Sequence, residues 1–351
     1  MPVFHNKISK KELKQKIKNE DVGRLNVSMY SYTPVSNPQS LRNKLYSRLF
    51  EIKVFGRIYI AHEGINLQAS VPQHAYVEFL FVMSCFFDLN KAVINKSVGP
   101  ANKSFWVLKI KVRDKIVADG ITDASFDMRN KGKYVNAEEF NKLTEDENTI
   151  VVDMRNHYEY EVGHFDHAIE IPSDTFREQL PMAVDMLGDK KDANIIMYCT
   201  GGIRCEKASA YMKHNGFKNV FHLEGGIIQY ANMVKEKNLQ NKFHGKNFVF
   251  DDRLGEKIGD EIISVCHQCG KPADTHTNCV NPGCHLLFIQ CDECREKYEG
   301  CCSENCRDII HLPEEEQLLI RKGINKGQNI FNKSKKRMLQ LSQLPKRDIK
   351  E

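Results

Sequence analysis

Cys199 and Arg204 are the residues whose types and spacing are best suited to covalent chemistry. Cys199 ends the apolar run 195–198, and a short loop ending at Arg204 precedes a helical segment. This pattern predicts a strand, a tight loop and a helix. The loop N–H groups and the helix N-terminus would then face the sulfur, and with the guanidinium they would lower the thiol pKa and create a nucleophilic thiolate. We expect four residues to form this cradle: Thr200, Gly201, Gly202 and Ile203.

Three nearby residues are secondary candidates for the same site. Cys205 could resolve an oxidised Cys199 sulfur as a disulfide, or it could be a buried residue on the first helical turn. Asp153 and Arg155 end the apolar run that starts at residue 150. They should lie at the carboxyl end of a parallel strand, which is the edge where α/β sheets place their active sites. The alternative for Cys199 itself is a structural cysteine buried at a strand end.

A second group of reactive side chains lies in the cysteine-rich segment near the C-terminus. Paired cysteines at short spacing in a reducing compartment favour one or two closed structural zinc sites. Structural disulfides, simply packed thiols and an iron–sulfur cluster are the alternatives. His267, His276 and His285 are spare ligands. The expected metal ligands are Cys266, Cys269, Cys279, Cys284, Cys291, Cys294, Cys302 and Cys306.

The N-terminal part of the chain alternates strand and helix patterns. Expected strands over 25–32, 54–60, 65–70 and 105–112 and helices over 39–50 and 72–87 give the order β-α-β-β-α-β of a ferredoxin-like module. Such a sheet either takes single-stranded RNA on its open face or only supports the rest of the protein. Its central hairpin carries candidate substrate-binding residues that could equally stabilise the turn: Arg57, His62, Glu63 and Asn66.

The middle of the chain predicts a parallel sheet. Apolar strands near 150–155, 195–199 and 220–223 alternate with helical segments, which is the pattern of an α/β domain. The whole chain is therefore expected to be an α/β multidomain protein. The cysteine-rich segment after it has few apolar residues, and the residues from 321 onward are basic and poorly patterned.

Composition bounds where the protein works and what it binds. The 351 residues carry a net charge of +5, with basic ends flanking a mildly acidic middle. This asymmetry indicates either a polyanionic partner such as nucleic acid or a solvated surface with a disordered tail, and charge alone does not choose between them. No apolar run is long enough to cross a membrane and no signal peptide is visible. We therefore expect a cytoplasmic protein with reduced thiols and no membrane association.

Several motifs together resemble a known family. The segments 152–155, 163–172 and 223–226, with the Cys199 loop, resemble a rhodanese domain. With 56–66 and the cysteine-rich end, nearly the whole chain is similar to the tRNA uridine hydroxylase family. The resemblance implies an oxidoreductase that uses the rhodanese-loop cysteine and molecular oxygen to convert the wobble uridine, uridine 34, in the tRNA anticodon loop to 5-hydroxyuridine. No nucleotide cofactor is evident.

The expected organisation follows from these patterns and the resemblance. A ferredoxin-like domain spans 1–125, a linker 126–145, a rhodanese domain 146–242, a cysteine-rich zinc-binding domain 243–320 and a basic tail 321–351. Three functions compete. The first is tRNA uridine hydroxylation, the second is sulfur transfer from a Cys199 persulfide, and the third is a non-catalytic rhodanese module in an RNA-binding protein. The intact cradle argues against the third, and the basic termini favour the first over the second.

Overall fold

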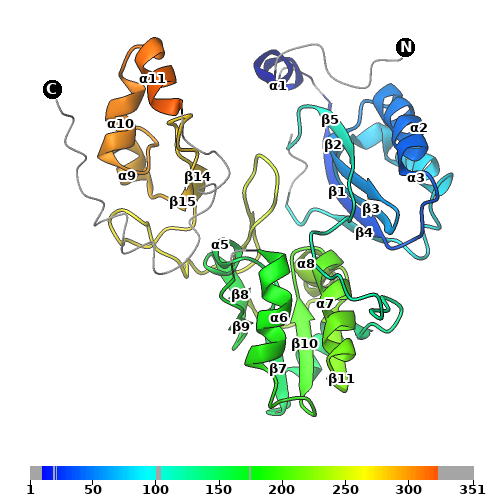
Figure 1. Cartoon of the computed structure of the whole chain (residues 1–351). Coiled ribbons are helices and arrows are strands. Elements are labelled where there is room, and N and C mark those ends of the chain that lie inside the picture. The colour runs from blue at the N-terminus through cyan, green and yellow to red at the C-terminus, as the bar shows by residue number, and fades with distance from the viewer. Residues whose placement is uncertain (1–9, 19, 21, 100–103, 174, 323–351) are drawn as a thin grey trace. The chain divides into compact units, whose positions relative to one another are not determined.

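The computed structural model describes residues 10–18, 20, 22–99, 104–173 and 175–322 (Figure 1). These residues form two compact units. The first contains Met1–Met154, Phe176–Asn241 and Phe250–Arg253, and the second contains Arg155–Thr175, Lys242–Val249 and Leu254–Glu351. Within the described ranges, no helix has the length and apolar character needed to cross a bilayer.

The first unit opens with a mixed, mainly antiparallel sheet covered by helices on one face. The strand order is β4-β1-β3-β2-β5, and α2 and α3 pack on the sheet through a core that includes Leu45, Leu49 and Phe79 (Figure 1). The connectivity from β1 to β4 is the predicted β-α-β-β-α-β order. The elements are α1 (Lys10–Lys18), β1 (Arg24–Ser31), α2 (Pro38–Glu51), β2 (Phe55–Ala61), β3 (Gly64–Pro72), η1 (Gln73–Ala75), α3 (Tyr76–Ser84), β4 (Val93–Lys96) and β5 (Leu108–Val112).

The strand that closes this module differs from the expectation. The segment 105–112 was expected to close it, but β5 within that segment lies parallel to β2 at the far edge of the sheet. The closing strand is instead β4, which pairs antiparallel with β1 from Val27↔Lys96 to Tyr30↔Val93. Only four residues long and bearing Asn95 and Lys96, β4 has too short an alternation to stand out in the sequence.

A parallel sheet forms the other half of the first unit. The strands run in the order β6-β11-β10-β7, and the central strand β10 is fully buried from Ile195 onward because helices cover both faces. The segment 126–145, expected as a linker, in fact supplies strand β6 to this sheet, with Tyr134 paired to His222. It also supplies helix α4, which contacts β6 and α8. The elements are β6 (Lys133–Val135), α4 (Ala137–Leu143), β7 (Thr149–Asp153), α6 (Phe176–Met186), β10 (Asn194–Tyr198), α7 (Ile203–His214), β11 (Asn219–Leu223) and α8 (Gly226–Lys237).

The second unit is built from short elements. Residues 155–175, expected in the central domain, belong to this unit because β8 pairs antiparallel with β12, with Phe165 opposite Phe243. Beyond residue 322 the expected basic tail lies outside the described residues. The elements are α5 (His157–Tyr160), β8 (Gly163–Phe165), β9 (Ile169–Glu170), β12 (Phe243–Asn247), β13 (Glu256–Lys257), β14 (His276–Asn278), β15 (Leu287–Ile289), α9 (Asp292–Lys297), α10 (Glu304–Ile310) and α11 (Glu314–Arg321).

The multidomain α/β fold class is confirmed. An N-terminal α+β module, a central parallel sheet and a C-terminal cysteine-rich segment are all present. The cysteine-rich segment has a small core in which Phe288 is surrounded largely by cysteines, including Cys279, Cys301 and Cys306. A core of this size is a weak source of stability by hydrophobic burial alone.

Candidate active site and cysteine clusters

Cys199 lies at the carboxyl end of the central strand β10, in a loop shaped by close backbone contacts. The parallel pairing of β10 with β11 brings the turn after β11 beside this loop, so that the Ile227 N–H donates to the Cys199 carbonyl at 3.0 Å. Gly226 has a φ of +63°, and a Cβ there would lie 2.3 Å from the Cys199 carbonyl oxygen. Gly202, with a φ of +96°, turns the chain into α7. Only glycine fits these two positions without strain.

The surroundings of the Cys199 sulfur favour a thiolate. Complete burial would by itself raise the pKa, but the Cys205 thiol, the Arg204 charge and the Cys205 and Gly202 N–H groups outweigh it, and the pKa falls from 9.0 to about 6. The Gly202 N–H donates to Sγ at 3.2 Å. Donors converging on an anion at a helix start are the arrangement that stabilises negative charge.

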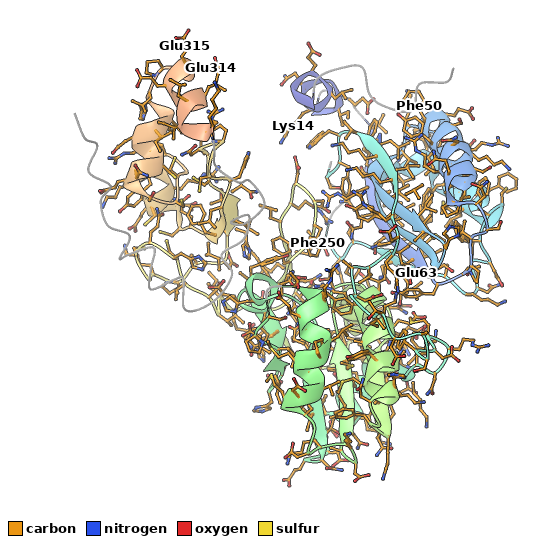
Figure 2. All side chains as sticks on the ribbon, in the orientation of Figure 1. Lys14, Phe50, Glu63, Phe250, Glu314 and Glu315 are labelled. Carbon is orange, nitrogen blue, oxygen red and sulfur yellow. The ribbon has the colours of Figure 1, made fainter. Side chains whose placement is uncertain are left out.

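Arg204 is held at the edge of the loop by two further contacts. Its Nη2 donates to Thr200 Oγ1 at 3.3 Å. Its guanidinium carbon lies 5.8 Å from the ring centroid of Phe250, a residue labelled in Figure 2. Both partners are in the first unit. The guanidinium is thereby kept close enough to act on the thiolate charge while its side chain remains partly accessible.

Cys199 is fully buried, as in the alternative of a structural cysteine at a strand end, whereas reactive cysteines usually lie partly exposed. The N-terminal sheet covers the loop. Asn95 Nδ2 on β4 donates to the carbonyls of Gly201 at 3.3 Å and Gly225 at 3.1 Å. A Cβ on Gly202 would lie 2.9 Å from the Tyr30 hydroxyl oxygen on β1. Residues of β1 and β4 that face away from the helices α2 and α3 therefore form the roof of the Cys199 loop.

These covering residues were not identified from the sequence. Ser28, Tyr30 and Tyr32 occur at every second position, the spacing that places side chains on one face of a strand. Tyr32, just after β1, donates through its hydroxyl to the Ile203 carbonyl at 3.1 Å. The alternation was a usable signal for a polar sheet face, but the sequence does not indicate that the Cys199 loop packs against that face. The open sheet surface considered for RNA is occupied along this strand.

The secondary candidates fall into different surroundings. Cys205 is fully buried on the first turn of α7, and its pKa is raised well above its ordinary value by burial and by its hydrogen bond to the Cys199 sulfur. Asp153 ends β7 as a buried carboxylate whose charge also raises the Cys205 pKa. Arg155 belongs to the second unit, where it donates to the Gly163 carbonyl at 2.5 Å. The structure thus brings Cys205 to the Cys199 sulfur, and Asp153 into the electrostatic environment of Cys205.

The candidate residues of the β2–β3 hairpin are engaged in packing contacts. Glu63, labelled in Figure 2, lies 2.5 Å from the Lys207 ammonium and accepts from the Ile116 N–H at 2.8 Å. Asn66 donates to the Ile116 carbonyl at 3.3 Å. His62 Nδ1 lies 3.0 Å from the Val35 carbonyl oxygen. Arg57 is exposed on β2. Glu63 and Asn66 therefore anchor the segment around Ile116, and Glu63 also joins the hairpin to α7 through Lys207.

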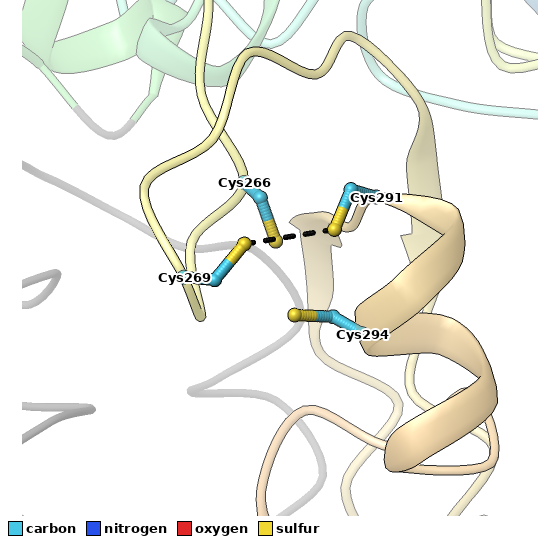
Figure 3. A group of neighbouring side chains, drawn as sticks. All are labelled: Cys266, Cys269, Cys291 and Cys294. Atoms are coloured by element: carbon cyan, nitrogen blue, oxygen red, sulfur yellow. Dashed lines mark hydrogen bonds between the residues drawn. The ribbon is translucent and has the colours of Figure 1, made fainter.

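The eight cysteines expected as metal ligands fall into two groups within the described residues. In each group the four sulfur atoms all lie within 4.8 Å of one another. Figure 3 shows the first group, in which the four sulfurs point toward a common centre and Cys269 and Cys291 are joined by a contact of 3.6 Å. Cys301 is buried but belongs to neither group. The groups are Cys266, Cys269, Cys291 and Cys294, and Cys279, Cys284, Cys302 and Cys306.

The fold and the loop define a multidomain protein built around a rhodanese-like domain. Residues 136–233 match the rhodanese-like domain, 24–116 match the UPF0176 acylphosphatase like domain and 244–307 match the rhodanase C-terminal family. A solved rhodanese-like domain from Anabaena sp is 21% identical and covers 32% of this chain and 78% of its own, with a TM-score of 0.26.

Full-length relatives identify the family. The chain is 57% identical over 339 residues to a tRNA uridine(34) hydroxylase of Photorhabdus laumondii subsp. laumondii, with 96% of each chain covered. It is 58% identical over 336 residues to a tRNA uridine(34) hydroxylase of Yersinia enterocolitica, covering 95% of this chain and 96% of the other. This protein belongs to the tRNA uridine(34) hydroxylase family, as the resemblance in its motifs predicted.

Proposed function

We propose that this protein hydroxylates uridine 34 of tRNA at C5, with molecular oxygen as co-substrate and Cys199 as the nucleophile. The observation that carries the proposal is the Cys199 sulfur at the start of α7, which accepts from the Gly202 N–H at 3.2 Å. These surroundings, with Arg204 and Cys205, lower its pKa to about 6 and favour the thiolate. An ionised thiol is the form that adds to an electron-poor ring. The names of the full-length relatives supply the substrate, and the Cys199 loop supplies a nucleophile suited to it.

The first step activates the base. Cys199 adds to C6 of uracil, which turns C5 into the nucleophilic carbon of an enolate. The N–H groups of the loop and the Arg204 guanidinium stabilise the resting thiolate. Once the sulfur has bonded to C6 and lost its charge, the same groups stabilise the enolate oxygen. C5 then reacts with dioxygen to give a hydroperoxide after protonation.

The second step removes one oxygen atom and restores the ring. The Cys205 thiol takes the terminal oxygen of the hydroperoxide and becomes a sulfenic acid, leaving an alcohol at C5. Loss of the C5 proton and cleavage of the C6–S bond release 5-hydroxyuridine and the Cys199 thiolate. That thiolate displaces water from the sulfenic acid to form a disulfide, which an external thiol reduces. In the resting protein the Cys199 charge, after burial, is one of the causes that raise the Cys205 pKa. Once Cys199 is bonded to the base this charge is gone, and Cys205 ionises more readily.

Access to Cys199 requires the roof over the loop to move. The sulfur has no exposed surface, and Asn95 and Tyr30 lie over its loop. We propose that tRNA binding separates the N-terminal sheet from the loop and that the flipped base takes the space so created. An anticodon loop presents unstacked bases, which lowers the cost of extruding one. Binding should weaken steeply with salt because phosphate contacts release counterions.

Sulfur transfer remains the second candidate, because the same cradle would also stabilise a persulfide on Cys199. Thiosulfate and cyanide assays distinguish it. Rapid thiocyanate formation by the wild-type protein, without 5-hydroxyuridine formation on tRNA, would favour sulfur transfer over hydroxylation.

The decisive experiment measures 5-hydroxyuridine by mass spectrometry in tRNA that lacks the modification. We expect Cys199→Ser and Cys199→Ala to form none, and Cys205→Ser to form product only slowly. Cys85→Ser, which changes an exposed cysteine in the first unit, is the matched control and should keep full activity. Normal product formation by Cys199→Ala would refute the proposed chemistry.

A further inference from the structure

We propose that the two cysteine groups of the second unit each bind one structural zinc ion, and that the two sites are interleaved so that each depends on the other. The ligand pairs along the chain are 266 with 269, 279 with 284, 291 with 294, and 302 with 306. The first and third pairs form one group, and the second and fourth form the other. This inference concerns the stability of the second unit and is independent of the Cys199 chemistry.

The sulfur separations fit a tetrahedral zinc site. Four sulfurs at a zinc–sulfur distance of 2.3 Å define a tetrahedron whose edges are about 3.8 Å. The sulfur atoms of Cys269 and Cys291 are 3.6 Å apart, and Cys302 lies 3.7 Å from both Cys284 and Cys306. These distances far exceed a disulfide bond of about 2.05 Å. Each group therefore has the spacing of ligands around one central ion.

The donor set selects the kind of metal. Each group consists of four thiols, and soft sulfur ligands in a tetrahedron favour zinc over calcium or magnesium, which take oxygen ligands. A four-iron cluster places several iron and sulfide atoms between its cysteines, and sulfurs that all lie within 4.8 Å leave no room for them. A single closed ion per group is the arrangement that fits.

Both groups are built in the same way from a loop and a helix start. In the first, Cys266 lies in a tight turn closed by its carbonyl accepting from the Gly270 N–H at 2.9 Å. Cys291 caps α9 and Cys294 lies within it. In the second, the Cys284 N–H donates to the Asn281 carbonyl at 2.9 Å in the loop.

The helix half of the second group follows the same plan. Cys306 lies in the first turn of α10, whose cap Ser303 accepts from the Cys306 N–H at 3.2 Å. The Cys302 N–H donates to the Cys279 sulfur at 3.4 Å, the kind of contact that stabilises a metal-bound thiolate. Each of the two groups thus takes two sulfurs from a loop and two from a helix start, and this repeated arrangement is difficult to explain as chance packing.

Interleaving makes the two sites mutually dependent. The first site ties residue 269 to residue 291, and the chain between them carries Cys279 and Cys284 of the second site. The second site ties residue 284 to residue 302, and the chain between them carries Cys291 and Cys294 of the first. Cys279, Cys302 and Cys306 of the second site also form most of the small core around Phe288, so loss of that ion loosens the chain that carries Cys291 and Cys294.

Metal analysis of the purified full-length chain tests the proposal. We expect two zinc ions per chain by elemental mass spectrometry, without iron. Cys269→Ser and Cys284→Ser each remove one ligand, one from each group, and each variant should retain well under one zinc. Retention of one full zinc by both variants would overturn the interdependence, and zinc below one ion per wild-type chain would overturn the sites.

A control variant and a second readout keep the test independent of misfolding. Cys85→Ser removes a cysteine outside both groups and should keep two zinc ions. Wild-type chain produced with cobalt in place of zinc should show the intense visible absorption of tetrahedral thiolate-bound cobalt, at two ions per chain. Weak absorption typical of octahedral oxygen ligation, or zinc loss from Cys85→Ser, would contradict the assigned ligands.

Discussion

The Lys207 ammonium nitrogen lies 2.6 Å from a carboxylate oxygen of Asp119, and both side chains are only 1% exposed. Lys207 is on α7, the helix that begins at the Cys199 loop, and it also pairs with Glu63 of the β2–β3 hairpin. One buried cation thus joins the N-terminal module to the helix that follows the Cys199 loop. Neither residue of this pair was singled out from the sequence.

Removing the buried cation should destabilise the first unit. Lys207→Met removes the buried cation beside Asp119 and leaves that carboxylate only the half-exposed Lys115 ammonium at 3.6 Å. Breaking a buried ion pair costs about 3–5 kcal/mol, so we expect a loss of up to that size. Urea unfolding followed by fluorescence measures the loss. Lys237→Met, which breaks a half-exposed pair with Glu138, is the control and should cost less than about 1 kcal/mol. Equal stability of the two variants would contradict the structural role of Lys207.

The reactivity of Cys199 should depend on pH with a midpoint of about 6. The lowered pKa means that the reactive thiolate is the major form above this pH, and that alkylation slows as the pH falls through it. The measurement is the rate of iodoacetamide labelling of the Cys199 peptide by mass spectrometry between pH 5 and 9. Arg204→Gln removes the nearby positive charge and should move the midpoint upward. An unchanged midpoint in that variant would show that the guanidinium does not act on the sulfur.

Weakening the roof should expose Cys199. Asn95→Ala removes two hydrogen bonds to the loops around Cys199, each worth about 0.5–1.5 kcal/mol net, so the open population should rise about tenfold. Labelling of Cys199 at fixed pH should accelerate by the same factor. Asn232→Ala is the control. It removes one exposed hydrogen bond from α8 to the Lys96 carbonyl of β4, which does not involve the Cys199 loop, and it should change the rate far less. Similar acceleration in both variants would mean that Asn95 has no specific covering role.

The turn after β11 should tolerate no side chain. Gly226→Ala would place a Cβ 2.3 Å from the Cys199 carbonyl oxygen at a positive φ, so we expect a loss of at least about 3 kcal/mol of unfolding free energy. Activity on tRNA should fall with it because the loop is displaced. Gly99→Ala meets no atom within 4 Å and should change stability by no more than about 0.5 kcal/mol. Thermal unfolding of the two variants makes the comparison.

The strongest sequence signals were short patterns with a direct chemical meaning. The apolar run before Cys199 predicted strand β10, and the glycines after it predicted the loop that leads into α7. These features depend on local periodicity and on backbone constraints that act over a few residues. Spacing also identified the eight paired cysteines, because ligands of a closed metal site recur at short intervals.

Features that depend on tertiary contacts were not accessible in the same way. Spacing gives the cysteine pairs but does not show which pairs join, and the interleaved grouping appears only in the fold. Asp119 and Lys207 are 88 residues apart, and each has the sequence context of an ordinary surface charge. The short strand β4 was missed because four residues carry too little periodicity, although its Asn95 contacts the Cys199 loop directly.

The roof over Cys199 has a consequence for survival of the resting enzyme in an aerobic cell. A thiol that is already ionised is also the form that hydrogen peroxide oxidises most readily, through sulfenic to irreversible sulfinic and sulfonic acids. With its sulfur sealed beneath Tyr30 and Asn95, the resting protein keeps bulk oxidants from a group they would otherwise inactivate. Under the proposed function, damage should therefore be concentrated in molecules whose roof has opened for the tRNA, so that the working lifetime of the protein depends on how often it acts rather than on its age.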